Sequence, residues 1–312
     1  MKIACVGEAM IELSMGRGDS SAEIGFAGDT LNTAVYLQRT LESAGEHANH
    51  NVSYVTALGT DNFSQQITTL VQNENISTDL IQRCEDRVPG LYAINTDDNG
   101  ERSFTYWRDQ SAAKTLFSAD TGPDFEQLTD FDLIYYSAIS LAILPDGVKQ
   151  QWLGFLESYR KLPDKLVAFD SNYRPRLWDS VAHARQYTKA AFVRCDIAMP
   201  SVDDEMALFG DTSKTAVLER LASYELSRGV LKCGVDGPVD LADVGTSHTL
   251  PVATSIVDST AAGDSFNGAY LAGTVLEKPS SQCIADGHHC AMRVIGFPGG
   301  IVDRSLWEAN RT

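Results

Sequence analysis

Short apolar runs rich in β-branched residues alternate with longer stretches of helical periodicity over most of the chain, and this alternation limits the possible folds more than any other feature. It is typical of an α/β fold with a mainly parallel sheet, covered by helices in a three-layer α/β/α arrangement. Asp61 or Asn62 is predicted to cap one helix, and Pro145 to open another. Strands are predicted at residues 2–7, 52–58, 133–137, 166–170, 197–199 and 230–232.

Two segments interrupt the alternation, residues 11–26 and residues 88–108, and both have the pattern of antiparallel strands. In the second, Asp98, Asn99 and Gly100 are typical of a hairpin turn between two strands. We therefore expect the two insertions to form a small β-sheet that covers the main domain as a lid. Since no stretch rich in Pro, Gly or Ser separates two units, residues 1–312 are predicted to form one domain.

The charge balance excludes a nucleic-acid-binding protein. The chain has 42 acidic side chains against 25 Lys or Arg, a formal net charge of −17, whereas nucleic acids are bound by clusters of cations. The most apolar stretch, residues 133–144, is shorter than the roughly twenty residues that span a membrane. Glu8 falls where a signal peptide would be apolar, and the six cysteines show no disulfide pattern. We expect a cytoplasmic protein without a membrane partner.

The segment 256–276 has the pattern of an anion site: a short strand, a turn of small residues and a helix. Ala261, Ala262 and Gly263 let the backbone approach a ligand, and the amides at the helix N-terminus are free donors. Asp264, in the first turn, is either a base for phosphoryl transfer or simply an acid that favours a helix N-terminus. The glycine-lysine loop of P-loop enzymes and a complete dinucleotide-binding loop are both missing from the sequence.

Two motifs resemble the signatures of the ribokinase-like carbohydrate kinases: DSTAAGD at residues 258–264 and GFAGDTLN at residues 25–32. GERSFTYWR at residues 100–108 and DSNYRPRLW at residues 170–178 are similar to the 2-keto-3-deoxygluconate kinases within that family. The resemblance extends over nearly the whole chain. It implies a ribokinase-like fold and ATP-dependent phosphorylation of 2-keto-3-deoxygluconate on its terminal hydroxyl, which gives the 6-phosphate and ADP.

The resemblance also implies roles for individual residues. Asp264 would take the proton from the sugar hydroxyl, and the amides of the turn formed by Ala261, Ala262, Gly263 and Asp264 would form the anion hole for the phosphoryl group. Asp258 and Thr260 match positions that hold a monovalent cation such as K⁺, and Mg²⁺ accompanies ATP. Sugar ligands would be Gly28, Asp29, Asn32, Tyr92, Tyr106, Arg108 and Arg174, and nucleotide ligands would be Lys232, Gly234, Gly237, Gly263 and His289.

The sequence departs from the family pattern at several places. Ser201-Val202-Asp203-Asp204 replaces the frequent Asn-x-x-Glu, which keeps a carboxylate but loses the amide. Ala27 and Ala261 stand where glycine is common. A direct contact of Ser201 with metal or phosphate is therefore not expected.

The residues of the strand 101–108 favour an acidic substrate independently. Side chains alternate along a strand, so Phe104, Tyr106 and Arg108 share one face with Arg102. The alternative to a substrate-binding role is that these side chains simply form a solvated strand face. With Arg174 as a second cation, however, Arg108 could hold the carboxylate of a sugar acid.

Two other functions stay open: a kinase of the same fold for a neutral sugar such as fructose or ribose, and a non-catalytic sugar-acid sensor. A neutral sugar would not need the arginine pair, and the presence of Asp264 beside the small-residue turn argues against a sensor. We also expect a homodimer, because an exposed face of the lid sheet could pair between subunits.

Overall fold

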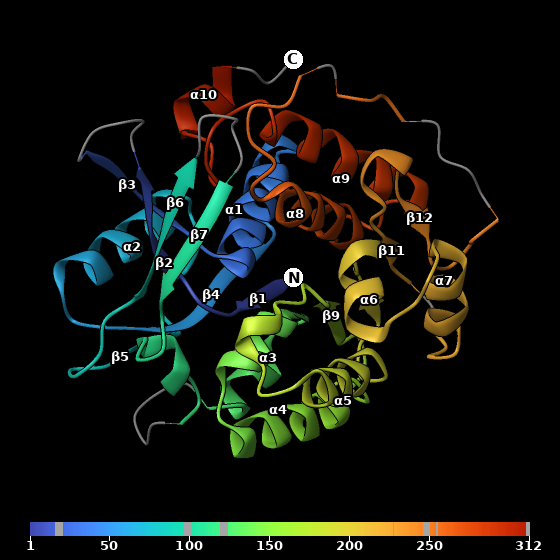
Figure 1. Ribbon diagram of the computed structural model, residues 1–312, viewed down its shortest axis with the longest axis horizontal. Helices are drawn as coiled ribbons and strands as arrows, with labels where there is room; N and C mark the ends of the chain where they lie inside the picture. Colours follow the sequence, from blue (N-terminus) through green and yellow to red (C-terminus); the bar gives the residue numbers. More distant parts are fainter. Residues whose placement is uncertain are drawn as a thin grey trace.

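The computed structural model describes residues 1–15, 21–96, 102–118, 124–226, 228–245, 250–253 and 255–309. Its centre is a six-stranded sheet in the order β10-β9-β8-β1-β4-β5, and every neighbouring pair is parallel (Figure 1). The main parallel sheet predicted from the sequence is thereby confirmed. The strands are β1 (Lys2–Val6), β4 (Asn51–Leu58), β5 (Ile81–Arg83), β8 (Leu133–Ser137), β9 (Leu166–Asp170) and β10 (Ile197–Ala198).

Helices cover both faces of this sheet, so the fold has the three predicted layers (Figure 1). The α-helices are α1 (Asp29–Ser43), α2 (Asn62–Asn73), α3 (Ala138–Ile143), α4 (Asp146–Tyr159), α5 (Val181–Phe192), α6 (Val202–Phe209), α7 (Lys214–Ala222), α8 (Ala262–Val275), α9 (Ser280–Val294) and α10 (Arg304–Ala309). Short 3-10 helices are η1 (Ala112–Thr115), η2 (Glu126–Asp130), η3 (Pro175–Leu177) and η4 (Gly234–Asp236).

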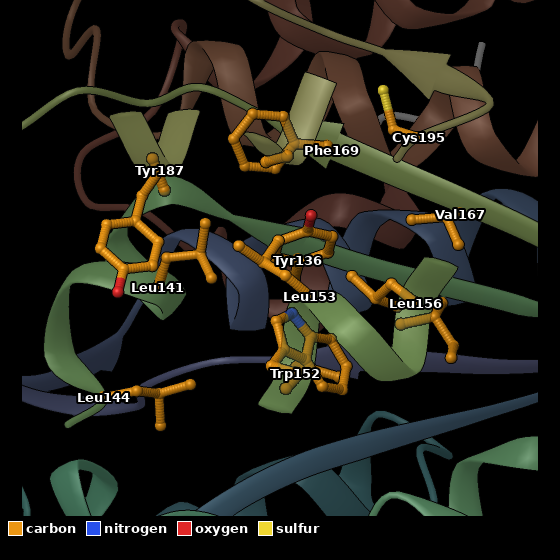
Figure 2. Close-up of a cluster of buried hydrophobic side chains, with 14 of the residues drawn as sticks. Tyr136, Leu141, Leu144, Trp152, Leu153, Leu156, Val167, Phe169, Tyr187 and Cys195 are labelled. Carbon is orange, nitrogen blue, oxygen red and sulfur yellow. The ribbon is translucent and has the colours of Figure 1, made fainter. Parts of the chain in front are cut away.

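Each face of the sheet has its own apolar core. On one face, Tyr136 and Phe169 pack with Trp152 and Leu156 of α4 (Figure 2). On the other, Tyr135 packs with side chains of α1, α2, α8 and α9. Successive strand residues such as Tyr135 and Tyr136 therefore enter opposite cores, and this explains why the central strands are apolar throughout.

The predicted helix starts are confirmed. The carboxylate of Asp61 accepts hydrogen bonds from the amides of Phe63 at 2.9 Å and Ser64 at 3.1 Å, which caps α2. Pro145 directly precedes α4. Among the described helices, none has both the length and the apolar character that a membrane crossing requires.

Residues 230–232 were predicted as a strand, and β11 (Val230–Leu231) lies there, but it pairs antiparallel with β12 (Val239–Asp240) instead of entering the six-stranded ladder. Isolated parallel bridges, such as that between Ser201 and Lys232, connect this segment to the end of β10. Lys232 is thereby brought to the same edge of the sheet as the residues that follow β10.

A second, four-stranded sheet in the order β3-β2-β6-β7 stands at one side of the molecule (Figure 1). Two antiparallel hairpins form it, and β2 joins them by parallel pairing with β6. The predicted fold class, a mainly parallel sheet with an additional small β-sheet, is confirmed. Residues 16–20 and 97–101, which include the predicted turn at Asp98, Asn99 and Gly100, lie outside the described residues. The strands are β2 (Met10–Met15), β3 (Ala22–Ala27), β6 (Gly90–Thr96) and β7 (Arg102–Trp107).

Candidate active site

A cleft of about 1270 Å³ lies at the carboxyl ends of the parallel strands. Glu8 follows β1, Asp170 ends β9 and Ser201 follows β10, and all three line the cleft. Open α/β sheets bind their ligands at this edge. The second sheet contributes Tyr92 and Tyr106 to the opposite wall.

Most of the residues predicted to form the site line this one cleft, although they come from distant parts of the chain. Three of the predicted residues, Asp258, Gly237 and His289, are not part of its lining. His289 is exposed on α9, and Gly237 follows η4. The predicted residues in the lining are Gly28, Asp29, Asn32, Tyr92, Tyr106, Arg108, Arg174, Lys232, Gly234, Thr260, Ala261, Ala262, Gly263 and Asp264.

The turn before α8 has the tight geometry expected of an anion site. Ala261 has φ 60° and ψ 14°, a left-handed conformation that favours glycine. The amide of Ala262 donates to the carbonyl of Ser259 at 3.2 Å. The amides of Gly263 and Asp264 follow in the first turn, where a helix offers no carbonyl acceptor. These two donors are therefore better placed for an anion than that of Ala262.

The Asp264 carboxyl group is buried and held in place. Its Oδ2 accepts a hydrogen bond of 2.8 Å from Nδ2 of Asn32 in α1. Burial, and next the negative charge of Asp29, raise the pKa of Asp264 to about 7, against the lowering effects of the Asn32 hydrogen bond and the Lys232 charge. A carboxyl with a pKa near neutrality is well suited to act as a general base.

Asp29 lies in the first turn of α1 beside this group. Asn172 donates to Oδ2 of Asp29 at 3.0 Å, and burial raises the pKa of the Asp29 carboxyl. Gly28 precedes α1, and a Cβ at this position would lie only 2.1 Å from the carbonyl oxygen of Glu8. Glycine is therefore required for α1 to begin this close to the segment after β1.

The wall formed by the second sheet is aromatic. Tyr92 and Tyr106 are directly opposite in the β6–β7 pairing, with ring centroids 5.7 Å apart. The hydroxyl of Tyr92 donates to the carboxylate of Glu12. A phenol ring beside a polar cleft offers both an apolar surface and a hydroxyl for a sugar.

Both arginines of the predicted carboxylate clamp contact carboxylates of the protein. Arg108 forms a buried ion pair with Glu8. Arg174 is 49% exposed, and its Nη1 lies 3.3 Å from Oδ1 of Asp204 and 2.8 Å from the carbonyl of Tyr173. Arg108 is thus held firmly, whereas Arg174 has the exposure and the long contact of a side chain that can turn toward a ligand.

The sequence analysis missed several polar residues that line the cleft or lie next to its lining. Glu8 and Glu12 are buried, and the visible signal was that two carboxylates interrupt an otherwise apolar N-terminal stretch. Asp170 and Asn172 belong to the quoted motif at residues 170–178 but received no role. Asn267, on the buried side of α8, gave no signal of its own.

The oxygen donors near the cleft fit Mg²⁺ in part. Asp203 and Asp204 line it at the start of α6, and carboxylate oxygens are ligands that Mg²⁺ prefers. The side chain of Ser201 accepts from the amide of Asp204 at 3.3 Å and so caps α6. Within the described residues, no three His, Cys, Asp or Glu side chains are grouped as a metal-binding set, so a metal here would also need ligands from the nucleotide.

Asp258 connects the loop before α8 with the loop after α9. One carboxylate oxygen accepts from the amide of Thr260 at 2.7 Å and the other from the amide of Gly299, also at 2.7 Å. Asp258 therefore fixes the position of the turn from which the anion site begins.

Comparisons with known proteins agree with this geometry. The model of the pfkB family carbohydrate kinases matches residues 1–306. The chain is 41% identical over 313 residues to a 2-dehydro-3-deoxygluconokinase of Escherichia coli K12, with 99% of each chain covered. Two solved structures have the same fold. Aminoimidazole riboside kinase from Salmonella enterica, complexed with aminoimidazole riboside and an ATP analogue, matches with a TM-score of 0.82 and 18% identity over all of both chains. A putative ribokinase II from E. coli in complex with ATP and Mg²⁺ matches with a TM-score of 0.81 and 17% identity, over 96% of this chain and 94% of that one.

Proposed function

Because the chain belongs to the pfkB family of carbohydrate kinases, we propose that its cleft phosphorylates 2-keto-3-deoxygluconate with ATP. The products are the 6-phosphate and ADP. The observation that carries this assignment is the 41% identity to a 2-dehydro-3-deoxygluconokinase over 99% of both chains. The name 2-dehydro-3-deoxygluconokinase denotes the same activity as 2-keto-3-deoxygluconate kinase. The enzyme is a phosphotransferase with an alcohol group as acceptor.

Asp264 is the general base. The terminal hydroxyl of the sugar acid gives its proton to the Asp264 carboxylate while its oxygen forms a bond to the γ-phosphorus of ATP. The bond from that phosphorus to ADP breaks in the same step. Asn32, which donates to Oδ2 of Asp264, fixes the orientation of the base. The pKa of about 7 lets a large share of the enzyme carry the base in its ionised form at neutral pH.

The transferred phosphoryl group binds at the turn before α8. We assign the anion hole to the Ala261–Gly263 turn and the Asp264 amide, with Gly263 and Asp264 as the principal donors because the Ala262 amide already bonds to Ser259. The positive end of the α8 dipole adds to this stabilisation.

The sugar acid binds between α1 and the second sheet. Gly28, Asp29 and Asn32 contact its hydroxyls, and Tyr92 and Tyr106 enclose it from the other wall. Arg108 and Arg174 bind its carboxylate. Arg174 exchanges its 3.3 Å contact with Asp204 for the ligand, which its exposure allows.

ATP occupies the remaining length of the cleft. Lys232, Gly234 and Gly263, which line the cleft, are its proposed contacts, and Asp203 and Asp204 are proposed to hold Mg²⁺. Gly237 and His289, which lie outside the lining, are proposed as further contacts at the far end of the nucleotide. When bound, Mg²⁺ neutralises charge on the phosphate oxygens. A monovalent cation such as K⁺ is proposed near Asp258 and Thr260.

The second sheet, contributed by residues 11–26 and 88–108, is proposed to act as a lid, and its outer face to join two subunits in a cytoplasmic homodimer. Strand register places Met15, Ile24 and Trp107 on the face opposite to Tyr92 and Tyr106. Ile24 is 55% exposed and Trp107 is 59% exposed. Apolar side chains of this size on one outer face are typical of an interface.

ADP release in the presence of 2-keto-3-deoxygluconate, ATP and Mg²⁺ tests the proposal directly. We expect one ADP for each 6-phosphate formed, measured by a coupled assay and by mass spectrometry of the product. Release of ADP only with fructose or ribose would favour the neutral-sugar kinase, and ligand binding without any ADP release would favour the sensor.

A further inference from the structure

A buried polar network lies beneath the cleft and ends at Lys232. Nζ of Lys232 lies 2.8 Å from Oδ2 of Asp170 and 3.0 Å from Oδ1 of Asn267. Nδ2 of Asn267 donates to the same Asp170 oxygen at 2.6 Å, and the amide of Asn172 donates to the other at 3.2 Å. Asp170 is 3% exposed and Asn267 is fully buried. Three elements, β9, α8 and the segment after β11, thus converge on one ammonium group.

The ammonium group has a proton left for a ligand. A lysine carries three N–H donors, and Asp170 and Asn267 take two of them. Lys232 lines the cleft, and a Cβ placed on Gly263 would lie 3.6 Å from its Nζ. The charge is therefore adjacent to one of the two principal donors of the anion hole.

The surrounding charges make this position unusual. Asp29, Asp170 and Asp264 all line the cleft. Of the three arginines among the described residues of its lining, Arg108 contacts Glu8 and Arg174 contacts Asp204, while Arg176 is exposed on η3. Among the described residues that line the cleft, Lys232 is the one lysine. The phosphoryl group brings negative charge into this acidic region as it is transferred, and a fixed cation there lowers the energy of the transition state.

We propose that Lys232 binds the phosphoryl group during its transfer, and that Asp170 and Asn267 are positioning residues that hold the ammonium beside the Gly263 amide. The inference rests on the proposed kinase activity and adds to it a catalytic residue with two supporting groups. It goes beyond the contact of Lys232 with ATP proposed above, because it places that contact on the phosphoryl group in the transition state and so predicts a fall in kcat with little change in KM for ATP.

The same network reaches the general base. Nδ2 of Asn267 also lies 3.3 Å from the hydroxyl of Tyr135. The hydroxyl of Thr33 lies 3.2 Å from that of Tyr135 and 3.2 Å from the carbonyl oxygen of Asp264. The cation and the base are therefore held by one connected set of buried groups, which fixes their separation during the reaction.

The test compares Lys232→Met, Asp170→Asn and the double variant with wild type, on 2-keto-3-deoxygluconate and ATP at saturation. Removing a single stabilising donor from a transition state costs roughly 10²- to 10³-fold in kcat. We expect Lys232→Met to lose about 100-fold or more in kcat while both KM values change by less than about threefold. Asp170→Asn should lose about 10-fold or more. Lys161→Met removes a lysine that is 72% exposed and serves as the matched control, with unchanged kcat.

The double variant shows whether Asp170 acts through Lys232. If it does, Asp170→Asn has nothing further to disturb once Lys232 is absent, and the double variant should be no slower than Lys232→Met. Losses that multiply in the double variant would overturn the positioning role. A folded Lys232→Met variant with kcat within about threefold of wild type would overturn the proposal as a whole.

The double variant also controls for folding. Lys232→Met leaves the buried Asp170 carboxylate without its cation, which destabilises the fold, whereas the double variant is neutral at this position. We expect the double variant to unfold at a higher temperature than Lys232→Met but to remain as inactive. Activity that returns together with stability would overturn the proposal. A wild type without activity would instead overturn the kinase assignment, and this inference with it.

The pH profile gives a readout that a structural role would not produce. The positive charge of Lys232 lowers the pKa of Asp264, and the negative charge of Asp170 raises the pKa of Asp264. The acid limb of kcat/KM should therefore move to higher pH in Lys232→Met and to lower pH in Asp170→Asn. Equal movement in one direction would indicate general disturbance of the site and overturn the proposal.

Discussion

Asp264 is the residue on which the proposed catalysis depends most. Its carboxyl group is buried at the start of α8, and Asn32 holds it with a hydrogen bond from a position 232 residues earlier in the chain. Burial raises its pKa to about 7, so the group keeps enough basicity to accept a proton from an alcohol near neutral pH. An exposed aspartate at a helix N-terminus would ionise at much lower pH and be a weaker base.

Asp264→Asn should preserve the fold and abolish most of the activity. The two side chains have the same shape, but the amide cannot accept the proton, and general-base catalysis contributes roughly 10²- to 10⁴-fold. We expect a loss of kcat in that range in a steady-state ADP-release assay, with circular dichroism unchanged. A variant with more than about a third of wild-type kcat would reduce Asp264 to a helix-terminal acid.

The same substitution should change stability in a way that depends on pH. Because the folded pKa of about 7 exceeds the ordinary aspartate value of 3.8, the folded state binds the extra proton, and stability from this group is lost as pH rises from about 4 to 7. Asp264→Asn removes that loss. We expect the variant to unfold at a higher temperature than wild type at pH 8 and at nearly the same temperature at pH 4. A melting difference that is independent of pH would contradict the raised pKa.

At the scale of elements, the second sheet is the part of the fold with the least core of its own. Its buried cluster consists of Met10, Ala27, Tyr92 and Ile94, whereas each face of the main sheet has a large one. Elements with few buried contacts open more easily than the rest of a protein. Since Tyr92, Tyr106 and Arg108 lie on or directly after its strands, we expect this sheet to close on the sugar.

Closure should be visible in hydrogen exchange. We expect exchange in peptides from residues 88–96 and 102–108 to slow when 2-keto-3-deoxygluconate is saturating, because closure excludes water from the cleft. Peptides from the buried strand β8 (Leu133–Ser137) serve as the internal control and should not change. Unchanged exchange across both lid segments would count against a lid that moves.

Much of the fold could be predicted because its central elements have simple patterns. β8 and β9 have the predicted boundaries, since buried parallel strands are continuous apolar runs. β5 (Ile81–Arg83) was not predicted, because three residues with two polar side chains carry no strand pattern. The site was predictable where motifs are local, as in the Ala261–Asp264 turn.

Other parts of the site depend on contacts that a sequence does not display. The ion pair of Arg108 with Glu8 joins residues 100 positions apart, and that of Lys232 with Asp170 joins residues 62 positions apart. Neither carboxylate partner, Glu8 or Asp170, was assigned a role in the site from its own neighbourhood. The functions of these two carboxylates therefore became interpretable only once the fold had placed them beside their cations.

For the whole molecule, the outer face of the second sheet is the proposed dimer contact. Trp107→Asp should shift the protein from dimer to monomer in sedimentation velocity, because it places a charge in an apolar interface. Leu162→Asp changes an exposed leucine elsewhere, 41% accessible, and should leave the mass unchanged. A monomeric wild type, or a dimer that tolerates Trp107→Asp, would refute this contact.

The net charge of the molecule also bears on its substrate. A protein at −17 repels a carboxylate at long range, so a sugar acid must be recognised by short-range contacts with cations. Arg108 and Arg174, which line the cleft, are the residues proposed to supply these contacts. Because Arg108 is paired with buried Glu8, its removal is best made together with Glu8→Gln, which avoids an unpaired buried charge.

The most direct measurement is the ratio of kcat/KM for 2-keto-3-deoxygluconate to that for fructose, in wild type, Arg174→Ala and Glu8→Gln/Arg108→Ala. Loss of a desolvated charge contact costs roughly 2 to 5 kcal/mol, so we expect each variant to lose about 30-fold or more in kcat/KM for the sugar acid. Activity on fructose should fall far less, so the ratio drops in both variants. A wild type that prefers fructose, or equal losses on both sugars, would contradict a kinase that recognises its substrate by the carboxylate.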